Sequence, residues 1–439
     1  MKFVPSKESL KQHRVPEWFH DAKLGIFIHW GLFSVPAFAA EKLTLGESQK
    51  RGVSVHMKNN PYAEWYLNSL MIEGSPTQRY HRENYGDDFS YERFAEIFNE
   101  EIKKWAPEDM VDLFIKAGAK YVVLVTKHHD GFLLWQSKYP NPKKENYYAS
   151  RDIVGELTES VKGKGLRMGL YYSGALDWSW NPHPIIDEKS WLTNGPSGID
   201  YTKYANNHWY ELIDKFDPII LWNDIGYPPN TNVYEIFAYF YNKHPDGVIN
   251  DRWIQYHKSD FDHPPVRHKD FSTPEYRTMK EISELKWEST RGIGYSFGYN
   301  KMETEQDYLK PEELIRMFID IVSKNGNLLL NIGPMADGTI PELQKKAISI
   351  KVRSKMQNRR VFSLPNLKVE IVRPLENSEF CSRCTRLRLT SNGFLKPCLM
   401  VFDNLVDVLT PLRNGASDEK IKKLFVEAVK RRKPYFQSS

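Results

Sequence analysis

The stretch that decides the fold is Pro218–Pro228, which reads PIILWNDIGYP. Its first half, Ile219–Leu221, is a short apolar run that predicts a strand buried on both faces. Asp224 follows at the carboxyl end of that run, beside Trp222, and Gly226 then breaks the chain into a loop. A carboxylate just beyond a buried strand is typical of a reactive group in parallel α/β enzymes, but taken alone it is equally typical of a capping residue.

The same layout recurs on both sides of this stretch. Further apolar runs that predict strands are LGIFIHW (24–30), YVVLV (121–125), LRMGLYY (166–172), GVINDRW (247–253) and LLLNI (328–332). Helical patterns lie between them at residues 91–104, 107–117, 152–164, 201–216, 233–243 and 311–324. Alternating helices and buried strands predict a parallel sheet, and 439 residues suffice for an irregular (β/α)8 barrel of the TIM type with a small appendage.

Polar and aromatic side chains stand at the carboxyl ends of these runs. They are His29, His128, His129, Tyr171, Asp224 and Arg252. In a barrel such strand ends converge on one mouth, so residues far apart in sequence line one pocket. A coincidence at five strand ends is the weaker explanation.

The composition limits the classes of partner. A net charge of +5 over 439 residues is too dilute to indicate nucleic acid or an anionic membrane. The N-terminus lacks the apolar core of a signal peptide, and no apolar run approaches the roughly 18 residues of a membrane span. All three Cys lie after residue 380, which argues against a disulfide framework. We therefore expect a cytoplasmic protein without a membrane or nucleic-acid partner, and a homo-oligomer.

The inventory of motifs favours glycoside hydrolysis. The sequence has no HExxH metal motif, no GxGxxG after a strand, no Walker loop and no GxSxG elbow. Carboxylates, histidines, an arginine and aromatic residues suit a reaction in which one carboxylate attacks the anomeric carbon and another protonates the leaving oxygen. Asp224 is the natural nucleophile. Spacing alone leaves the acid open among Glu64, Glu275 and Glu288.

Seven separated motifs resemble the α-L-fucosidases of glycoside hydrolase family 29. In chain order they are LGIFIHWGLFSVPAFA, NPYAEWY, TKHHDGF, YYSGALDW, LWNDIGYP, RGIGYSFGYN and GNLLLNIGPMADGTIPELQ. The resemblance covers residues 8–345. It implies a retaining exo-glycosidase that removes terminal α-L-fucosyl residues from oligosaccharides or glycoconjugates through a covalent fucosyl-enzyme, without a metal in the barrel or a cofactor.

The same resemblance implies roles residue by residue. Asp224 of the LWND motif is the implied nucleophile, and Glu275 of FSTPEY is the implied acid/base, with Glu64 or Glu288 as fallback. The implied fucose-binding residues are His29, Glu64, Trp65, His128, His129, Tyr171, Trp222 and Arg252. The polar side chains would hydrogen-bond the sugar hydroxyls, and the aromatic rings would pack on its apolar face and methyl group.

The chain departs from this family near residue 346, where a further helix and a β-sandwich are expected. Residues 366–435 instead resemble the C-terminal part of the GTP 3′,8-cyclase of molybdenum cofactor synthesis. That family's Cys-x2-Cys-x13-Cys pattern, matched by Cys381, Cys384 and Cys398, holds an iron–sulfur cluster. Its N-terminal CxxxCxxC has no match here. The resemblance thus implies no cyclase chemistry and at most a vestigial [4Fe-4S] or zinc site.

The junction should be helical. Leu343, Ala347 and Ile350 recur at helical spacing, which predicts a helix over Pro341–Gln357 in place of the barrel's closing helix. A strand is expected at Leu367–Val372, and proteolysis near residues 358–366. The expected parts are a catalytic barrel at 1–345, a junction helix or linker at 346–365 and a cyclase-like fragment at 366–439.

Two rival functions come from other classes. One is a folded but inactive sugar-binding remnant, whose barrel closure was lost with the replaced helix. The other is an iron–sulfur protein of molybdenum cofactor biosynthesis. Intact Asp224, Glu275 and Arg252 favour the enzyme over the remnant, and the missing CxxxCxxC opposes the iron–sulfur protein.

Overall fold

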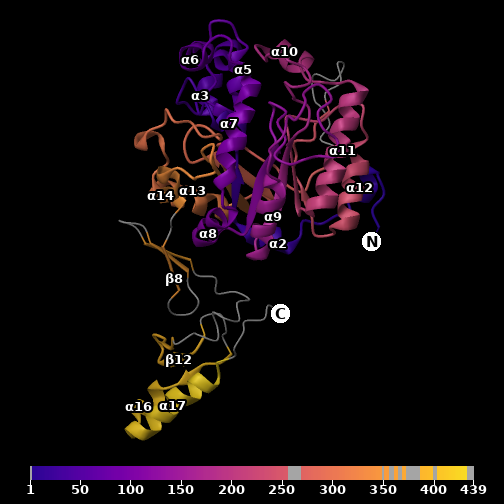
Figure 1. Ribbon diagram of the computed structural model, residues 1–439. Helices are drawn as coiled ribbons and strands as arrows, with labels where there is room; N and C mark the ends of the chain where they lie inside the picture. Colours follow the sequence, from indigo (N-terminus) through magenta and orange to yellow (C-terminus); the bar gives the residue numbers. More distant parts are fainter. Residues whose placement is uncertain are drawn as a thin grey trace. The chain divides into compact units, whose positions relative to one another are not determined.

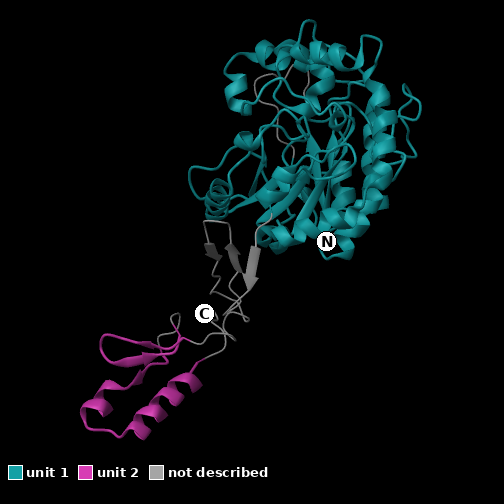
Figure 2. Cartoon of the chain, turned by 60° about the vertical axis from the view of Figure 1, so that its left-hand side comes forward, with its two compact units in different colours: residues 1–349 teal, residues 350–439 magenta. Residues whose placement is uncertain are grey.

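The computed structural model describes residues 2–255, 268–348, 351–354, 360–363, 368–371, 386–398 and 403–432. The chain divides into two compact units, residues 1–349 and residues 350–439 (Figure 2). The division falls just after helix α14 (Glu342–Ile348), the last helix of unit 1.

A seven-stranded parallel sheet forms the centre of unit 1. Its order is β5-β4-β3-β2-β1-β7-β6, and every neighbouring pair is parallel. The strands are β1 (Leu24–Ile28), β2 (Tyr121–Lys127), β3 (Arg167–Ser173), β4 (Ile220–Asp224), β5 (Val248–Ile249), β6 (Trp287–Gly292) and β7 (Gly326–Ile332). The curled sheet with its outer helices confirms the predicted TIM-like α/β fold (Figure 1).

An extended segment, residues 270–276, lies between the edge strands β5 and β6. Asp270 donates its backbone N–H to the carbonyl of Ile249 in β5 (2.9 Å), and Tyr276 donates to the carbonyl of Thr290 in β6 (2.9 Å). The segment therefore occupies the place of an eighth strand and closes the barrel. Neither this segment nor β6 was predicted as a strand, because both are rich in polar residues and lack an apolar run.

Helices cover the outer face of the sheet. Packed side by side in this order are α14, α8 (Pro107–Ala117), α9 (Ile153–Gly163), α11 (Ile199–Phe216) and α12 (Val233–Lys243), while α13 (Pro311–Ser323) packs on β7. Helices α1 (Lys7–Leu10) and α2 (Glu17–Ala22) precede β1. No helix in the described part of the chain is long and apolar enough to cross a membrane.

Shorter helices lie in two of the connections between strands, and those labelled α3, α5, α6 and α10 gather at one end of the barrel (Figure 1). The connection after β1 contains α3 (Leu45–Gln49), α4 (Val53–Lys58), α5 (Tyr66–Leu70), α6 (Pro76–Tyr85) and α7 (Phe94–Glu101), and the connection after β3 contains α10 (Glu188–Thr193). Connections that follow the carboxyl ends of barrel strands are where such folds keep their functional residues.

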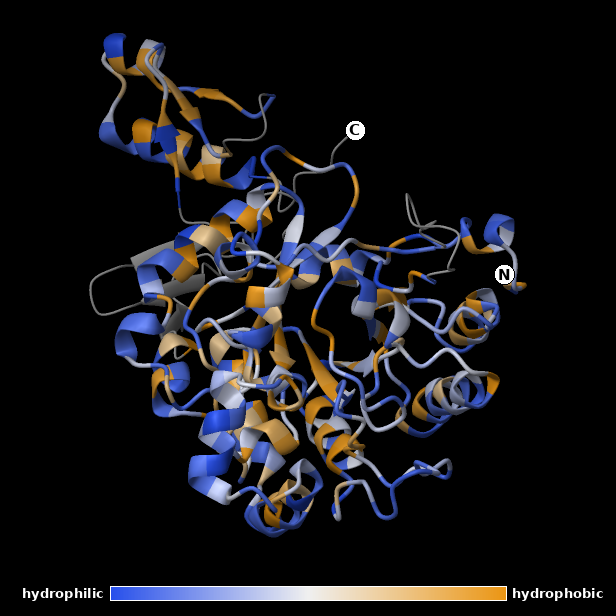
Figure 3. Cartoon of the chain, turned by 90° about the horizontal axis from the view of Figure 1, so that it is seen from above, coloured by the Kyte–Doolittle hydropathy of each residue, from blue (hydrophilic) through white to orange (hydrophobic). Residues whose placement is uncertain are grey.

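Both faces of the strands are buried, which explains their continuous apolar runs. Ile26 and Leu124 belong to the core between sheet and helices, whereas Phe27, Val123 and Trp222 belong to a separate cluster inside the barrel. In Figure 3 the strands at the centre of unit 1 are mostly hydrophobic, and the outer faces of its helices are mostly hydrophilic. His29 and Asp224 lie two residues beyond Phe27 and Trp222, and both are polar.

The junction differs from the helix predicted over Pro341–Gln357. Helix α14 packs against α8 as a closing helix, but it ends at Ile348, and strand β8 (Lys351–Ser354) follows. Ile348, Ile350 and Val352 alternate with polar residues, and this period of two favours a strand over a longer helix. The closing helix is present but shorter than predicted.

The described part of unit 2 contains two small antiparallel sheets. Strands β8, β9 (Arg360–Ser363) and β10 (Lys368–Ile371) form the first, and β11 (Arg388–Leu389), β12 (Phe394–Lys396) and β13 (Val406–Asp407) form the second. Strand β10 confirms the strand predicted at Leu367–Val372, and it pairs with β9. The expected cleavage stretch 358–366 contains β9, and its other residues lie outside the described ones.

The described part of unit 2 also contains the helices α16 (Leu409–Arg413) and α17 (Asp418–Lys430). Helix α17 packs on β12 and β13, and the buried cluster there comprises Leu395, Val406, Val408 and Ala428. Unit 2 is thus the small appendage that was predicted in place of a β-sandwich.

Candidate active site

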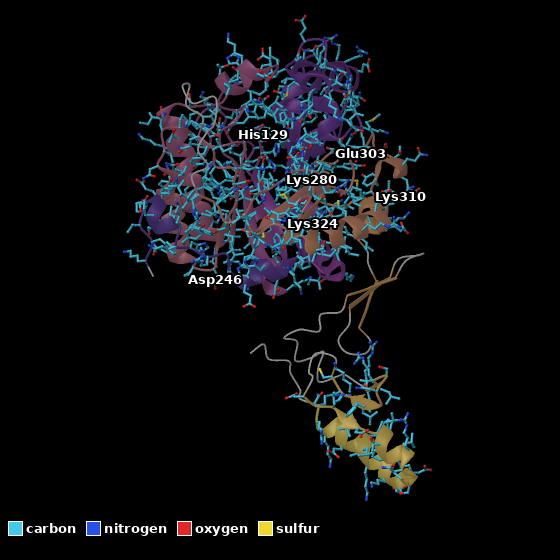
Figure 4. All side chains as sticks on the ribbon, turned by 180° about the vertical axis from the view of Figure 1, so that it is seen from behind. His129, Asp246, Lys280, Glu303, Lys310 and Lys324 are labelled. Carbon is cyan, nitrogen blue, oxygen red and sulfur yellow. The ribbon has the colours of Figure 1, made fainter. Side chains whose placement is uncertain are left out.

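The carboxyl ends of the barrel strands surround a cavity of about 610 Å³. Every barrel residue named from the sequence lines it except Glu288. These residues are His29, Glu64, Trp65, His128, His129, Tyr171, Trp222, Asp224, Arg252 and Glu275. His129, labelled among the side chains of unit 1 in Figure 4, is buried. The barrel therefore brings residues from five separate strand ends and two loops to one site.

Asp224 is the last residue of β4, and donors hold its side chain from two sides. Tyr171 donates its hydroxyl to Oδ2 (2.8 Å), and Arg252 donates Nη1–H to Oδ1 (2.9 Å). Burial and the Asp224 carboxylate raise the pKa of Tyr171 well above its ordinary value, so Tyr171 stays a donor. Burial alone would lower the pKa of Arg252, but the carboxylates of Asp224 and Glu275 outweigh it and raise that pKa. Arg252 therefore stays charged.

Arg252 joins Asp224 to a second carboxylate. Its Nη2–H donates to Oε2 of Glu275 (3.2 Å), and Oε1 of Glu275 accepts the hydroxyl of Tyr62 (2.7 Å). Thr273 fixes the guanidinium, because its hydroxyl accepts from Nε (2.9 Å) and its carbonyl from Nη2 (3.1 Å). The Glu275 side chain is 20% exposed, so it faces the cavity wall rather than bulk solvent. One cation thus holds two carboxylates beside one another.

The turn after Asp224 is strained. Ile225 has a φ of +58° and Gly226 a φ of +81°. Glycine adopts this left-handed region readily, but a β-branched residue there costs about 1–3 kcal/mol. Asn223 holds the turn, since its side-chain amide donates to the carbonyls of Gly226 and Arg252, both at 2.8 Å. This conformation leaves the Ile225 side chain on the cavity.

Three buried histidines present neutral rings to the cavity. Burial lowers the pKa of His29 to about 4, and it lowers the pKa values of His128 and His129 well below the ordinary value. His29 donates Nδ1–H to Oδ1 of Asn331 (2.7 Å), and His129 donates Nδ1–H to the hydroxyl of Ser173 (2.7 Å). Asn331 and Ser173 donate their own hydrogen bonds to backbone carbonyls, so each accepts from the histidine. Nδ1 of each ring therefore carries the proton, and Nε2 is an acceptor.

His128 is different, because its Nδ1 is buried without a hydrogen-bond partner among the described residues. An unpaired buried nitrogen is costly unless a ligand supplies the partner. The three rings together are suited to a ligand with several hydroxyl groups.

Glu64 lies in the short 3-10 helix η2 (Ala63–Trp65) and is 3% exposed. Its Oε2 accepts the backbone N–H of Gly298 (2.7 Å) and the hydroxyl of Ser296 (3.3 Å). Burial raises the pKa of Glu64 to about 8, so the carboxyl is mostly protonated at neutral pH. A protonated carboxyl both donates and accepts, which suits a sugar hydroxyl.

Glu288 lies in β6 and is fully buried, away from the cavity lining. It accepts the hydroxyl of Tyr121 (2.5 Å) and the indole N–H of Trp222 (3.0 Å). Burial raises the pKa of Glu288 to about 7. Trp222 in turn lies 4.7 Å from the guanidinium of Arg252. Glu288 therefore holds the Trp222 ring, which lines the cavity, through a hydrogen bond from inside the barrel.

Among the three candidate acids the geometry favours Glu275. Glu275 shares Arg252 with Asp224. Glu64 lines the cavity and accepts hydrogen bonds from Gly298 and Ser296, whereas Glu288 does not line the cavity.

Several lining residues were missed by sequence reasoning. Those on the short helices α3, α4 and α10 are Leu45, Gln49, Val53, His56, Met57, Glu188, Trp191 and Leu192, and the others are Phe27, Asn60, Tyr62, Ile225, Thr290 and Phe297. Asn60 and Tyr62 belong to the NPYAEWY motif, which offered a signal for them. The three helices are too short to show a periodic pattern, so no signal in the sequence pointed to the residues on them.

The cysteines lie in unit 2. Cys398 is a half-buried free thiol, while Cys381 and Cys384 lie outside the described residues. Within the described ranges, no group of three or more His, Cys, Asp or Glu side chains could hold a metal ion.

Comparison with family models finds both resemblances. The model described as "Alpha-L-fucosidase" matches residues 1–350, and the model described as "Molybdenum Cofactor Synthesis C" matches residues 336–438. The two resemblances predicted from sequence motifs are therefore confirmed.

Individual relatives agree with the first match. The chain is 32% identical over 353 residues to an alpha-L-fucosidase of Dictyostelium discoideum, covering 77% of this chain and 69% of that one. It is 41% identical to the Thermotoga maritima alpha-fucosidase solved in complex with fucose, with a TM-score of 0.70 over 83% of this chain and 84% of that one. An aspartate-to-glycine variant described as a Thermotoga maritima alpha-L-fucosynthase, in complex with alpha-L-Fuc-(1-2)-beta-L-Fuc-N3, is 42% identical with a TM-score of 0.72, covering 83% of this chain and 84% of that one.

Proposed function

The chain belongs to the α-L-fucosidase family of glycoside hydrolases, and we propose that it removes terminal α-L-fucosyl residues with retention of configuration. The carboxylate of Asp224 attacks the anomeric carbon while Glu275 protonates the glycosidic oxygen, and the leaving alcohol departs. A β-linked fucosyl ester on Asp224 remains. Glu275 then takes a proton from water, and the water oxygen displaces Asp224 to give α-L-fucose.

The observation that best supports this pairing is the shared guanidinium of Arg252. Its two terminal nitrogens contact Asp224 at 2.9 Å and Glu275 at 3.2 Å. A cation between two carboxylates offsets their mutual repulsion and keeps them close. The carboxyl separation of about 5–5.5 Å that a retaining enzyme needs stays a prediction.

The remaining residues would bind the fucosyl group. The rings of His29 and His129 offer Nε2 acceptors, Glu64 offers a neutral carboxyl, and the unpaired Nδ1 of His128 needs a partner. A site whose buried polar atoms are completed by sugar hydroxyls rejects analogues that lack those hydroxyls. Tyr171, Trp222 and Trp65 supply aromatic surface for the sugar's apolar face.

The solved relatives support the same assignment. The fucose complex belongs to a protein of the same fold. The relative described as an alpha-L-fucosynthase carries an aspartate-to-glycine substitution. The proposal needs neither a metal nor a cluster in the barrel, and the three-part domain boundaries, the homo-oligomer and the cytoplasmic location stay predictions from the sequence.

The test uses the purified chain and an aryl α-L-fucoside, with the first-formed sugar followed by proton NMR. We expect α-L-fucose to form before its β anomer. Initial release of β-L-fucose would contradict retention. Fucose binding without turnover would support the sugar-binding remnant, and an iron–sulfur chromophore without turnover would support the cofactor-pathway rival.

A further inference from the structure

We propose that His13 is a positioning residue for Glu275, and that it acts by holding Asp270 at the start of the closing segment, residues 270–276. The inference rests on the proposed function, in which Glu275 is the acid/base. Neither His13 nor Asp270 lines the cavity. His13 therefore acts through the closing segment and does not touch the sugar.

Asp270 receives hydrogen bonds from three different parts of the chain. Its Oδ2 accepts the backbone N–H of Ile249 in β5 (2.8 Å) and the hydroxyl of Tyr241 in α12 (2.7 Å). Its Oδ1 accepts Nδ1–H of His13 (2.8 Å), which lies in the N-terminal segment. All three partners are donors, which suits the ionised, acceptor-only form of the carboxyl group.

Both ring nitrogens of His13 face acceptors. Nδ1 faces the Asp270 carboxylate, and Nε2 lies 3.0 Å from the backbone carbonyl oxygen of Pro245. A histidine that donates to both partners carries two N–H groups and a positive charge. The ring also stacks on Tyr241 (3.9 Å, 14° between planes). His13 and Asp270 thus form an ion pair whose side chains are only 3% and 2% exposed.

The other titratable groups around His13 are Asp246, Tyr241 and His268. Burial alone would lower the pKa of His13, but the Asp270 carboxylate outweighs it, Asp246 adds to the effect, and the pKa rises above its ordinary value of 6.5. Tyr241 donates its proton to Asp270, so it accepts Nε2–H of His268 (2.6 Å). Burial lowers the pKa of His268, which therefore stays neutral at pH 7.

Carboxylates replace most of the backbone pairing on the β5 side of the closing segment. Among the described residues, the segment and β5 share one backbone–backbone hydrogen bond, from Asp270 to Ile249 (2.9 Å). The carboxylate of Asp270 accepts the return bond from Ile249. Oδ1 of Asp251 accepts the backbone N–H of Thr273 (3.1 Å). The β5 side thus depends on side chains, and the ion pair with His13 fixes the first of them.

The same segment carries groups of the proposed mechanism. Thr273 holds the guanidinium of Arg252 through its hydroxyl (2.9 Å) and its carbonyl (3.1 Å). Glu275 follows two residues later and contacts the same guanidinium (3.2 Å). A shift of the segment therefore displaces the acid/base and its cation together, and a displacement of about 1 Å can lower a rate by about 10²-fold.

Hydrogen–deuterium exchange in the full chain tests the anchor directly. The readout is the protection factor of peptide 268–276 from about pH 6 to about pH 9, which corrects for the intrinsic pH dependence of exchange. Because folding raises the pKa of His13, the ion pair is present below pH 6.5 and is lost as the pH rises through the raised pKa. We expect protection to fall over that range by roughly ten- to hundredfold, the effect of losing a hydrogen bond to a charged group.

Three variants separate the charge of His13 from its bulk. His13→Gln carries no charge at any pH, so its protection should be low and independent of pH. His13→Arg keeps a planar cation that can stack on Tyr241 and donate to both acceptors, so protection should persist to about pH 9. His183→Gln changes an exposed histidine and should match the wild-type chain. The same pH profile in the wild-type chain and in His13→Gln would overturn the proposal.

Activity tests whether the anchor reaches Glu275. The substrates are an α-L-fucosyl disaccharide, whose leaving group needs a proton, and α-L-fucosyl fluoride, whose leaving group does not. His13→Gln should lower kcat/KM for the disaccharide by about 10–100-fold and for the fluoride much less, and His13→Arg should restore the loss. Equal losses for both substrates would overturn the positioning role. An inactive wild-type chain with the expected exchange profile would instead refute the proposed function and leave the anchor of the segment standing.

Discussion

Unit 1 and unit 2 differ in what they bury. In unit 1 the core between the sheet and the helices buries large side chains such as Trp30, Trp135 and Trp209, each at most 1% exposed. The described cluster of unit 2 has four buried members, and apolar residues of α17 such as Phe425 and Val426 are 45% and 53% exposed. Because hydrophobic stabilisation scales with buried apolar area, the core of unit 1 contributes far more stability than the described core of unit 2.

The functional residues show the same division. Every residue that lines the cavity lies between Phe27 and Phe297, within unit 1. Unit 2 matches a different family model, described as "Molybdenum Cofactor Synthesis C", over residues 336–438. None of the described residues of that unit lines the cavity.

The largest effect is expected from a change at Asp224, and it tests whether activity depends on unit 1 rather than on unit 2. Asp224→Gly should lower kcat for an aryl α-L-fucoside by at least about 10³-fold, because the nucleophile is lost. External azide should restore part of the turnover and yield β-fucosyl azide, identified by NMR. The matched change in unit 2, Cys398→Ser, should leave kcat/KM unchanged. Undiminished turnover in the glycine variant would move the nucleophile elsewhere.

A smaller loss is expected at the acid/base. Glu275→Gln should lower kcat/KM by about 10²–10⁴-fold for leaving groups that need protonation and less for 4-nitrophenolate. Azide should now yield α-fucosyl azide, because Asp224 still forms the ester.

Glu64→Gln provides the matched control for this pair. It should raise KM without dependence on the leaving group, as expected for a residue that binds the sugar. If the leaving-group dependence appeared in the Glu64 variant instead, the acid would have to be reassigned.

The sequence allowed the barrel and the strand-end residues that line the cavity to be predicted, because strand runs and strand-end residues are local signals. His29, His128 and Asp224 each lie at most three residues beyond an apolar run. The closing segment at 270–276 was missed, since its pairing depends on Ile249 and Thr290, which are distant in sequence. The lining residues on α3, α4 and α10 were missed for a related reason, because short helices acquire their position through tertiary packing.

The third prediction concerns stability inside the barrel. Glu288 is fully buried with a pKa raised from 4.5 to about 7, so the folded state binds its proton more tightly than the unfolded state. Stability from this group is fully present below pH 4.5 and is lost as the pH rises to about 7, by about 3 kcal/mol at most.

Urea unfolding of the wild-type chain and of Glu288→Gln measures this term. As the pH rises from 4.5 to about 7, the free energy of unfolding of Glu288→Gln should increase relative to that of the wild-type chain. Glu284→Gln, which changes an exposed neighbour, should show no such relative increase. A difference that stays constant with pH would mean that Glu288 is ionised in the folded barrel.

The smallest effect is expected from removing unit 2 altogether. A chain that ends at Ser349 keeps α14, whose Ala347 and Ile348 are 5% and 1% exposed and whose Gln344 accepts the backbone N–H of Gly333 at 3.0 Å. It should retain kcat/KM within about twofold, because no cavity residue is lost. A chain that ends at Pro341 removes α14 as well and should unfold at clearly lower urea concentration, since it uncovers α8. If the chain that ends at Ser349 were inactive although folded, unit 2 would be part of the working enzyme. The contrast drawn between the two units would then be wrong.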